Sequence, residues 1–194
     1  MDLYSFLLIK ENFIPNNILN IILNYKNSNF KNAGVVLNNI NKMEFSDYRK
    51  TKILHLPNDV VNNLYNSIFL IHEQLFKKKY NSKLKNIERP LFLKYEVDDH
   101  YDVHNDCENF NENNQIERVC DRDLTVLFYL NNDYDGGELE LTNLQLTIKP
   151  KAGMMIAFPS YIEFSHKVHP IKNGTRYNIV SWLSTEKTIY PRPY

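Results

Sequence analysis

Residues 124–130 read Leu-Thr-Val-Leu-Phe-Tyr-Leu. In a strand, alternate side chains point to opposite faces, and here both alternating sets are mainly apolar. A strand with two apolar faces has to be covered on both sides. The stretch therefore predicts a central strand in the interior of a sheet.

On both sides of this run, from Pro90 onward, apolar residues come in short bursts separated by Asp, Asn, Gly and Pro, which is typical of strands and turns. The expected strands are 91–95, 124–130, 138–141, 144–148, 154–158, 163–168 and 176–183. About seven short strands with turn signals favour a double-sheet jelly roll over a meander. We therefore expect residues 90–185 to form a cupin-like, double-stranded β-helix core.

The first half of the chain has helical patterns at 15–25 and 58–79. The second is stronger, because its apolar residues recur every three or four positions and three lysines, 77–79, suit the negative end of the helix dipole. Residues 1–89 are thus expected to be a helical support packed on the core. With 186–194 as a C-terminal tail, the expected fold is mainly β with N-terminal helices (α+β), in one domain over 1–194.

Composition is that of an ordinary globular protein, with 194 residues, 43% hydrophobic and 24% charged. Basic and acidic residues number 23 each, so no global field favours nucleic acid or anionic lipid. The longest apolar runs fall far below the roughly 20 residues of a membrane span, and the first residues lack the features of a signal peptide. We expect a cytoplasmic protein that binds neither nucleic acid nor membrane.

A candidate metal site begins with His104-Asn105-Asp106, where an imidazole and a carboxylate two residues apart can project from one face of an extended chain. A third ligand is available in the segment 165–171, which contains His166 and His169 and precedes Arg176. A hairpin turn at 173–174 would place Arg176 on the face of His169, but consecutive strands of a jelly roll often lie in opposite sheets. Spacing alone leaves both histidines open.

Over residues 91–183, about half its length, the chain resembles the iron(II)- and 2-oxoglutarate-dependent dioxygenases of the prolyl 4-hydroxylase-like group. The ordered set of matching segments is far more specific than a single His-x-Asp triplet. The set is Tyr95 and Tyr101 ahead of His104-Asn105-Asp106, Arg122-Asp123-Leu124-Thr125, Tyr129-Leu130-Asn131, Gly136-Gly137-Glu138-Leu139, Pro150-Lys151-Ala152-Gly153, Phe158-Pro159-Ser160, His166-Lys167-Val168-His169-Pro170, Gly174-Thr175-Arg176-Tyr177 and Trp182. One departure is Asp98-Asp99-His100, which stands where the family usually has a glycine turn.

The resemblance implies that His104, Asp106 and His166 are the metal ligands. In the family the third ligand is the histidine ten residues before the basic residue, which selects His166 and leaves His169 as a neighbour. Two imidazoles and one carboxylate on one face of an octahedral ion leave three positions open, as in non-haem iron oxygenases. A structural zinc site would instead be closed by four protein ligands.

The same resemblance implies the co-substrate site. Arg176 is expected to bind the distal carboxylate of 2-oxoglutarate, because its guanidinium is a planar two-pronged donor. Tyr129 is expected to donate a second hydrogen bond, and Tyr95 to lie near the co-substrate. Arg122 and Trp182 are candidates for binding the substrate at the rim, with a solvated arginine and a core tryptophan as open alternatives. No catalytic residue beyond the metal ligands is expected.

The implied activity is hydroxylation of a prolyl residue in a proline-containing peptide or protein, with release of succinate and carbon dioxide. It requires Fe(II), 2-oxoglutarate and dioxygen, with ascorbate in support. The alternatives are a hydroxylase of a free amino acid or other small molecule, and a catalytically silent jelly-roll binding module. The intact ligand set and Arg176 argue against a silent module.

Between Cys107 and Asp121 the sequence is almost wholly polar. A loop this long in a compact domain is usually a lid or a disordered insert. Its place beside the candidate ligands favours a mobile lid over the site, and not a packed element. Cys107 and Cys120 are too few for a disulfide scaffold, so we expect free thiols.

Overall fold

The computed structural model describes residues 2–36, 43–44 and 47–189. The helices are α1 (Asn16–Leu23), α2 (Asn58–Ile71) and α3 (Lys77–Tyr80). The strands are β1 (Leu8–Lys10), β2 (Lys31–Asn32), β3 (Val35–Val36), β4 (Met43–Glu44), β5 (Arg49–Lys50), β6 (Lys52–Leu54), β7 (Leu84–Ile87), β8 (Leu91–Tyr95), β9 (His100–His104), β10 (Glu108–Phe110), β11 (Ile116–Arg118), β12 (Leu124–Tyr129), β13 (Tyr134–Gly136), β14 (Leu139–Leu141), β15 (Leu146–Ile148), β16 (Met155–Pro159), β17 (His166–Val168), β18 (Ile171–Gly174) and β19 (Arg176–Thr185).

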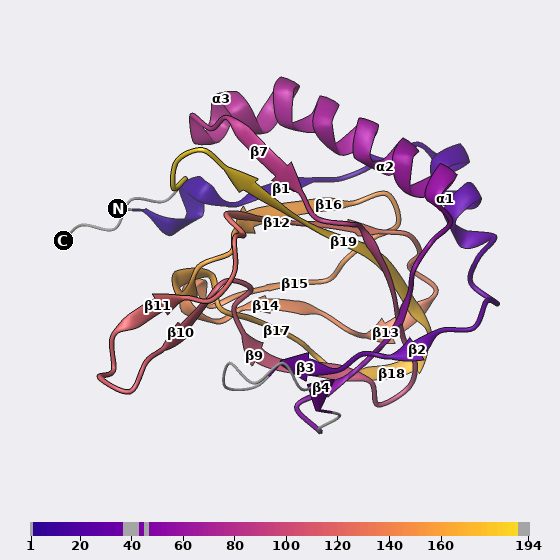
Figure 1. Cartoon of the computed structure of the whole chain (residues 1–194). Helices are drawn as coiled ribbons and strands as arrows, with labels where there is room; N and C mark the ends of the chain where they lie inside the picture. The colour runs from indigo at the N-terminus through magenta and orange to yellow at the C-terminus, as the bar shows by residue number, and fades with distance from the viewer. Residues whose placement is uncertain (1, 37–42, 45–46, 190–194) are drawn as a thin grey trace.

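Two antiparallel sheets lie face to face (Figure 1). The larger has eight strands in the order β1-β16-β12-β19-β8-β6-β2, with β7 also paired to β19. The smaller has five strands in the order β15-β14-β17-β9-β5. Consecutive strands often change sheet, as β8 and β9 do and again β15 and β16, which is the jelly-roll arrangement. The expected fold class, mainly β with a few helices, is confirmed.

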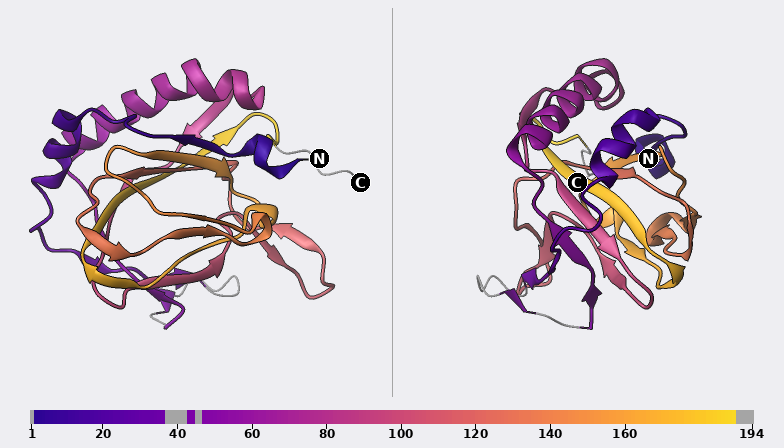
Figure 2. Two further views of the ribbon diagram at one scale, coloured as in Figure 1. Left: turned by 180° about the vertical axis from the view of Figure 1, so that it is seen from behind. Right: turned by 90° about the vertical axis from the view of Figure 1, so that its right-hand side faces the viewer.

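The helices cover the outer face of the larger sheet, as the views in Figures 1 and 2 show. Four apolar residues of α2 at helical spacing are buried there, Val60, Val61, Leu64 and Ile68. A π turn at His72–Phe76 joins α2 to α3, and the helix ends at Asn81, whose φ is 46°. The predicted helix at 58–79 is therefore confirmed, with one irregular turn inside it. No helix in the described part of the chain is long and apolar enough to cross a bilayer.

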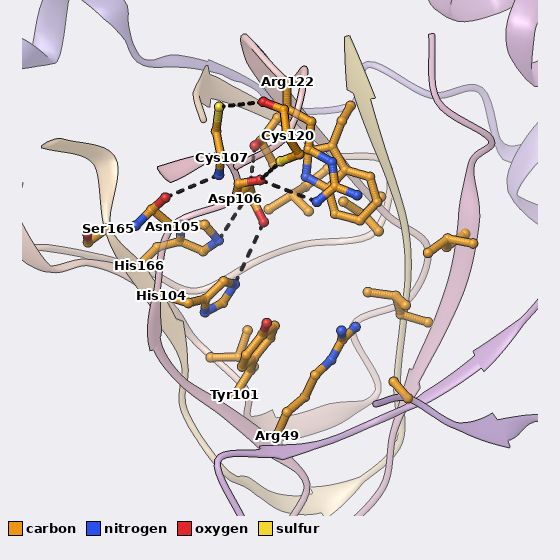
Figure 3. Close-up of a pocket in the computed structure, with 18 of the residues that line it drawn as sticks. Arg49, Tyr101, His104, Asn105, Asp106, Cys107, Cys120, Arg122, Ser165 and His166 are labelled. Atoms are coloured by element: carbon orange, nitrogen blue, oxygen red, sulfur yellow. Dashed lines mark hydrogen bonds and ion pairs between the residues drawn. The ribbon is translucent and has the colours of Figure 1, made fainter. Parts of the chain in front are cut away.

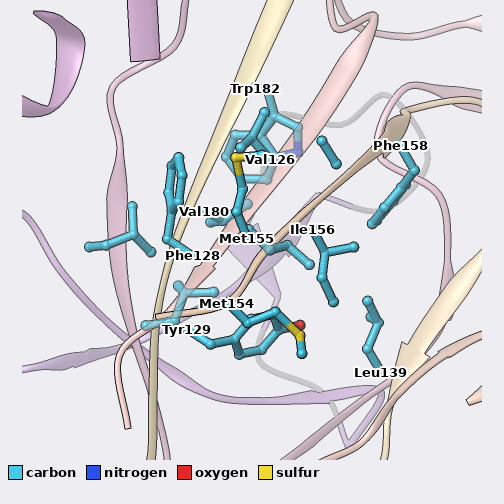
Figure 4. Close-up of a cluster of buried hydrophobic side chains, with 14 of the residues drawn as sticks. Val126, Phe128, Tyr129, Leu139, Met154, Met155, Ile156, Phe158, Val180 and Trp182 are labelled. Atoms are coloured by element: carbon cyan, nitrogen blue, oxygen red, sulfur yellow. The ribbon is translucent and has the colours of Figure 1, made fainter. Parts of the chain in front are cut away.

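Strand β12 is the central strand that residues 124–130 predict. All six of its residues are buried, because helices cover one face of the larger sheet and the smaller sheet covers the other. Val126 and Phe128 pack among side chains of β16 and β19 (Figure 4). The alternate residues, Thr125, Leu127 and Tyr129, face the space between the two sheets, where they line a pocket.

The N-terminal half differs from the expectation for residues 1–89. Besides its helices it supplies strands to both sheets, with β1, β2, β6 and β7 in the larger and β5 in the smaller. The support that residues 1–89 were expected to form therefore contains strands as well as helices. These strands have two to four residues each, too few for a periodic pattern to show. Residues 190–194 of the expected C-terminal tail lie outside the described residues.

The acidic turn before the metal motif is formed without glycine. Asp98 adopts a φ of 67°, a left-handed conformation that Asp and Asn tolerate better than most residues. The side chain of Asp99 accepts a hydrogen bond from the amide of Glu96 at 2.8 Å. These two residues therefore make the turn that leads into β9 and its terminal histidine.

Candidate active site

The three candidate metal ligands come from two neighbouring strands of the smaller sheet. His104 ends β9 and His166 begins β17, and the two residues are directly paired across the antiparallel ladder. Asp106 follows β9, and its amide donates to the carbonyl of Ser160 at 3.2 Å. Strand pairing thus brings the distant histidine to the His-x-Asp motif.

The ligand atoms of these residues all lie within 4.8 Å of one another. The Nε2 of His104 is 4.0 Å from one carboxylate oxygen of Asp106, and the Nε2 of His166 is 3.7 Å from the other (Figure 3). It is the one such group of three among the residues that the structure describes. His169 lies elsewhere, with its Nε2 2.7 Å from a carboxylate oxygen of Glu140.

Backbone carbonyls orient both imidazoles. The Nδ1 of His104 is 2.8 Å from the carbonyl of Asp102, and the Nδ1 of His166 is 3.0 Å from the carbonyl of Phe164. Because a carbonyl can only accept, each Nδ1 carries the proton and each Nε2 presents a lone pair to the centre. Such outer contacts commonly fix the tautomer of metal-binding histidines.

The ionisation of the cluster also suits a cation. Burial, together with the electrostatic effect of the neighbouring His166, lowers the pKa of His104 to about 3, so the imidazole of His104 is neutral. Burial acts to raise the pKa of Asp106, but the two histidines and the hydrogen bond from Thr125 outweigh it and lower the pKa. The Thr125 hydroxyl donates to Asp106 at 2.6 Å and is 2.9 Å from the Ser160 hydroxyl. Two imidazoles and one carboxylate are a ligand set for a divalent ion.

A buried cation lies deeper in the same pocket. Arg176 is 2% exposed, and its guanidinium donates to the Gly137 carbonyl at 2.7 Å and to the Asn178 side chain at 3.2 Å. Its guanidinium carbon is 4.2 Å from the centre of the Tyr95 ring and 5.5 Å from that of Tyr129. Among the described residues no carboxylate forms an ion pair with it, so its charge is left for a ligand.

Two phenols beside Arg176 have unused hydrogen-bonding capacity. The hydroxyls of Tyr129 and Tyr134, like the Nε of Arg176, are buried without a partner in the described structure. Burial raises the pKa of both phenols, that of Tyr134 to about 12, so both hydroxyls keep their protons. Buried polar groups are normally hydrogen-bonded. A guanidinium with two neutral donors nearby is therefore suited to an anion.

Arg122 and Trp182 form one unit at the rim. The guanidinium carbon of Arg122 lies 3.8 Å from the Trp182 ring centre, and its nitrogens bind both carboxylate oxygens of Glu88 at 2.7 and 2.8 Å. It also donates to the backbone carbonyl of Asp106 at 3.3 Å. Arg122 is thus not a freely solvated arginine. Trp182 is 9% exposed, with its indole nitrogen unpaired.

One pocket of about 930 Å³ brings the predicted site residues together. All eight line it: Tyr95, His104, Asp106, Arg122, Tyr129, His166, Arg176 and Trp182. Strand alternation explains this, because the residues from β8, β12 and β19 occupy positions that face the smaller sheet.

The sequence analysis assigned no role to Tyr101 or Thr125, although both belong to the matching segments, and it did not point to Tyr134 or Arg49 at all. Thr125 could have been found by alternation, since it lies four residues before Tyr129 and so on the same face. Tyr101 stacks on the His104 ring with centres 3.5 Å apart. Arg49 lies far back in the sequence, and no motif connects it to the site.

The segment 107–121, for which we expect a loop that acts as a mobile lid, has regular secondary structure. Instead of an irregular loop, β10 and β11 form a hairpin in which Phe110 is paired with Ile116, and it projects from the body of the fold (Figure 1). The Asn111 side chain accepts from the amides of Asn113 and Gln115 at 3.0 and 2.9 Å, which closes the turn. Asn109 and Phe110 line the pocket. Cys107 and Cys120 at its base are free thiols, as predicted.

Comparison with known proteins agrees with this geometry. Residues 90–184 match the model of the 2OG-Fe(II) oxygenase superfamily. A putative prolyl 4-hydroxylase of Acanthamoeba polyphaga mimivirus is 33% identical over 96 residues, which are 48% of this chain and 40% of that protein. The chain thus spans less than half of that relative.

Two solved structures share the fold. A prolyl hydroxylase from Trichoplax adhaerens, in complex with a peptide of hypoxia inducible factor, has a TM-score of 0.74 at 21% identity over 95% of this chain and 86% of that chain. The viral collagen prolyl hydroxylase of Paramecium Bursaria Chlorella virus-1, in its 2OG complex, has a TM-score of 0.68 at 19% identity over 94% and 97%. These two likenesses show a shared fold. The family match covers the strands that carry the cluster, and it shows that the chain, through residues 90–184, belongs to the 2OG-Fe(II) oxygenase superfamily.

Proposed function

We propose that this protein is an iron(II)- and 2-oxoglutarate-dependent dioxygenase that hydroxylates a prolyl residue in a peptide or protein. One observation carries the proposal: a two-histidine, one-carboxylate cluster shares a pocket with a buried arginine that has no carboxylate partner among the described residues. The cluster fits Fe(II), and the arginine fits the distal carboxylate of 2-oxoglutarate.

The residues of the pocket have different roles according to their positions. His104, Asp106 and His166 would hold the iron from one side, and Thr125 keeps the Asp106 carboxylate oriented. Bound iron(II) supplies the dioxygen chemistry, in which 2-oxoglutarate is converted to succinate and carbon dioxide and a substrate C–H bond is hydroxylated. Ascorbate is expected to sustain this chemistry by keeping the iron reduced.

Arg176 orients the co-substrate by a two-pronged hydrogen bond, and the protonated hydroxyl of Tyr129 donates beside it. Apolar side chains from both sheets, such as Leu127, Leu139 and Val180, line the same pocket and limit the access of water. Exclusion of water strengthens the charged hydrogen bonds to a bound anion.

A prolyl substrate is supported by two observations. The proteins that this chain resembles in sequence and fold are named as prolyl hydroxylases. The stacked pair of Arg122 and Trp182 offers an aromatic surface and donor groups at the rim of the pocket, which suit an apolar ring next to peptide carbonyls. The peptide is therefore the proposed partner.

The test is an assay of the protein with Fe(II), 2-oxoglutarate, ascorbate and a library of proline-containing peptides. We expect succinate and peptides that gain one oxygen on proline, both measured by mass spectrometry. Asp106→Ala should abolish iron binding and both products. His169→Ala should retain them, because His169 lies outside the cluster.

Other outcomes separate the alternatives. Oxidation of free proline or another small molecule, with no peptide product, would favour the small-molecule hydroxylase. Succinate without any oxidised peptide or amino acid would support the reaction class and contradict the prolyl substrate. Absence of both succinate and iron binding would favour a silent binding module.

A further inference from the structure

Arg49 brings a second guanidinium into the pocket from an unexpected part of the chain. It lies on β5, the outermost strand of the smaller sheet, directly paired with Tyr101 of β9. Its guanidinium carbon is 4.6 Å from the centre of the Tyr101 ring, which stacks on His104 at 3.5 Å and an interplanar angle of 14°. One aromatic ring therefore separates Arg49 from a metal ligand (Figure 3).

The charge of Arg49 is not neutralised within the described structure. Its Nη1 donates a long hydrogen bond of 3.4 Å to the Gly34 carbonyl, and its Nε is buried with no partner among the described residues. No carboxylate of the described residues pairs with it. An arginine in such surroundings loses hydration without regaining hydrogen bonds, so a ligand that supplies an acceptor would be favoured.

Neighbouring basic side chains, unlike Arg49, form ion pairs with carboxylates. Lys50 pairs with Asp47 at 3.0 Å, and Lys94 pairs with Glu96 at 2.6 Å. At the rim, Arg122 is held by Glu88. Of the other arginines that line the pocket, Arg176 is proposed above to bind the co-substrate, and Arg89 donates to the Leu56 carbonyl at 2.7 Å and to the Asn58 side chain at 3.1 Å. Arg49 thus stands out as a charge at the smaller sheet that faces the pocket and lacks an internal counterion.

We propose that Arg49 is a specificity residue that binds a carboxylate of the substrate, the side chain of an Asp or Glu beside the hydroxylated proline. This inference rests on the proposed function. A planar guanidinium recognises a carboxylate through two parallel hydrogen bonds. A single carboxylate matches the one charge of Arg49, whereas a doubly charged phosphate would be only half neutralised by it. Its place beside His104 puts the acidic side chain close to the reacting carbon.

Binding can be measured without turnover, because Trp182 is the single tryptophan of the chain and lines the pocket. Its fluorescence should report the titration of short blocked peptides with a central proline, each with an Asp one or two residues to either side, and of matched peptides with Asn in place of Asp. We expect the wild type to bind at least one Asp peptide about 10-fold more tightly than its Asn partner, as one charged hydrogen-bonded contact allows.

Arg49→Gln should abolish this preference by weakening the Asp peptide alone. Lys50→Gln is the matched control, since it removes the same charge from the neighbouring residue, which does not line the pocket; it should leave both affinities unchanged. Arg49→Lys should keep part of the preference. The affinity for 2-oxoglutarate, measured separately, should be the same in all variants.

The inference is overturned if Arg49→Gln weakens the Asp and Asn peptides equally, because the residue would then only support the pocket wall. It is also overturned if the variant loses affinity for 2-oxoglutarate, which would assign Arg49 to the co-substrate. If the wild type binds all peptides equally, this inference fails while the proposed function stands. If it binds none of them, the peptide substrate itself is contradicted.

Discussion

The guanidinium of Arg176 is buried with no carboxylate beside it in the described structure, which makes its removal a clean test of co-substrate binding. A charged hydrogen-bonded pair in a desolvated site contributes about 2–5 kcal/mol. Arg176→Ala should therefore weaken 2-oxoglutarate binding by about 30-fold or more, measured by calorimetry, while iron binding persists. Lys172→Gln, which removes a charge at an exposed position, should change neither.

The two phenols next to Arg176 extend this prediction. Tyr129→Phe and Tyr134→Phe each remove a buried hydroxyl without a partner, so the folded protein loses no internal hydrogen bond. We expect each variant to be at least as stable as the wild type and to bind 2-oxoglutarate more weakly, by less than Arg176→Ala. A hydroxyl whose loss leaves the affinity unchanged does not contact the co-substrate.

His104 makes the stability of the metal-free protein depend on pH. Its pKa is about 3 when folded, against about 6.5 in an unfolded chain. Between these values the unfolded state binds one more proton, so the free energy of unfolding falls as the pH falls, by at most about 1.4 kcal/mol per pH unit. His104→Gln lacks this proton uptake. In urea titrations from pH 7 to pH 4.5, the variant should gain stability relative to the wild type.

Part of the site could be predicted from individual residues. The residue types of the His104-Asn105-Asp106 motif and of Arg176 are themselves those that bind a metal ion and a carboxylate. The choice between His166 and His169 could not follow from spacing, since it depends on the register of β17 against β9, which places His166 directly opposite His104. The place of Arg49 in the site could not be predicted for a related reason. Its connection to the site is a register across a two-residue strand, which no local pattern reports.

The hairpin of β10 and β11 is the element that changes the interpretation of the sequence most. Its polar composition indicated an irregular loop, because both faces of an isolated two-stranded ribbon meet solvent and no alternation of apolar residues is needed. Conversely, α2 and β12 were predictable because each buries a continuous face against the core. The periodicity of apolar residues therefore indicates which elements are buried, and it does not detect elements that are exposed on both faces.

Replacing residues 109–117 by a short Gly-Ser linker tests what the hairpin does. Glu108 is kept, because its carboxylate accepts from the amide of Ile162 at 2.9 Å. Most of the replaced residues are exposed, so thermal stability and 2-oxoglutarate binding should be preserved. Asn109 and Phe110 line the pocket, so hydroxylation of the peptide should fall while uncoupled succinate formation persists.

A full rate of hydroxylation in the shortened protein would show that the hairpin is an insert without a part in the reaction. Loss of the folded state would instead make it structural. Phe110→Ser is a milder companion variant: its side chain is exposed and lies on the pocket side of the hairpin. It should lower peptide affinity with no change in melting temperature.

In the molecule as a whole, the two sheets and the helices share one hydrophobic core, and the pocket lies between the two sheets. The residues that line it come from both sheets, so metal and co-substrate contacts link the sheets when they form. Binding of 2-oxoglutarate and iron should therefore raise the melting temperature, since a ligand that binds only the folded state adds its binding free energy to the stability. The net charge of the protein adds little to the binding of these ions, since acidic and basic residues balance at 23 each.

Strand β1 has a further role as the outer neighbour of β16, pairing Leu8, Ile9 and Lys10 with Ala157, Ile156 and Met155. All five residues of β16 are buried. Without β1, this apolar strand would become the edge of the sheet and expose unpaired backbone amides and carbonyls to other molecules. Such bare sheet edges promote self-association into aggregates. Deletion of residues 2–12 should therefore produce concentration-dependent light scattering at temperatures where the intact chain stays clear, and a deletion variant that remains monodisperse would show that the edge is protected by other means.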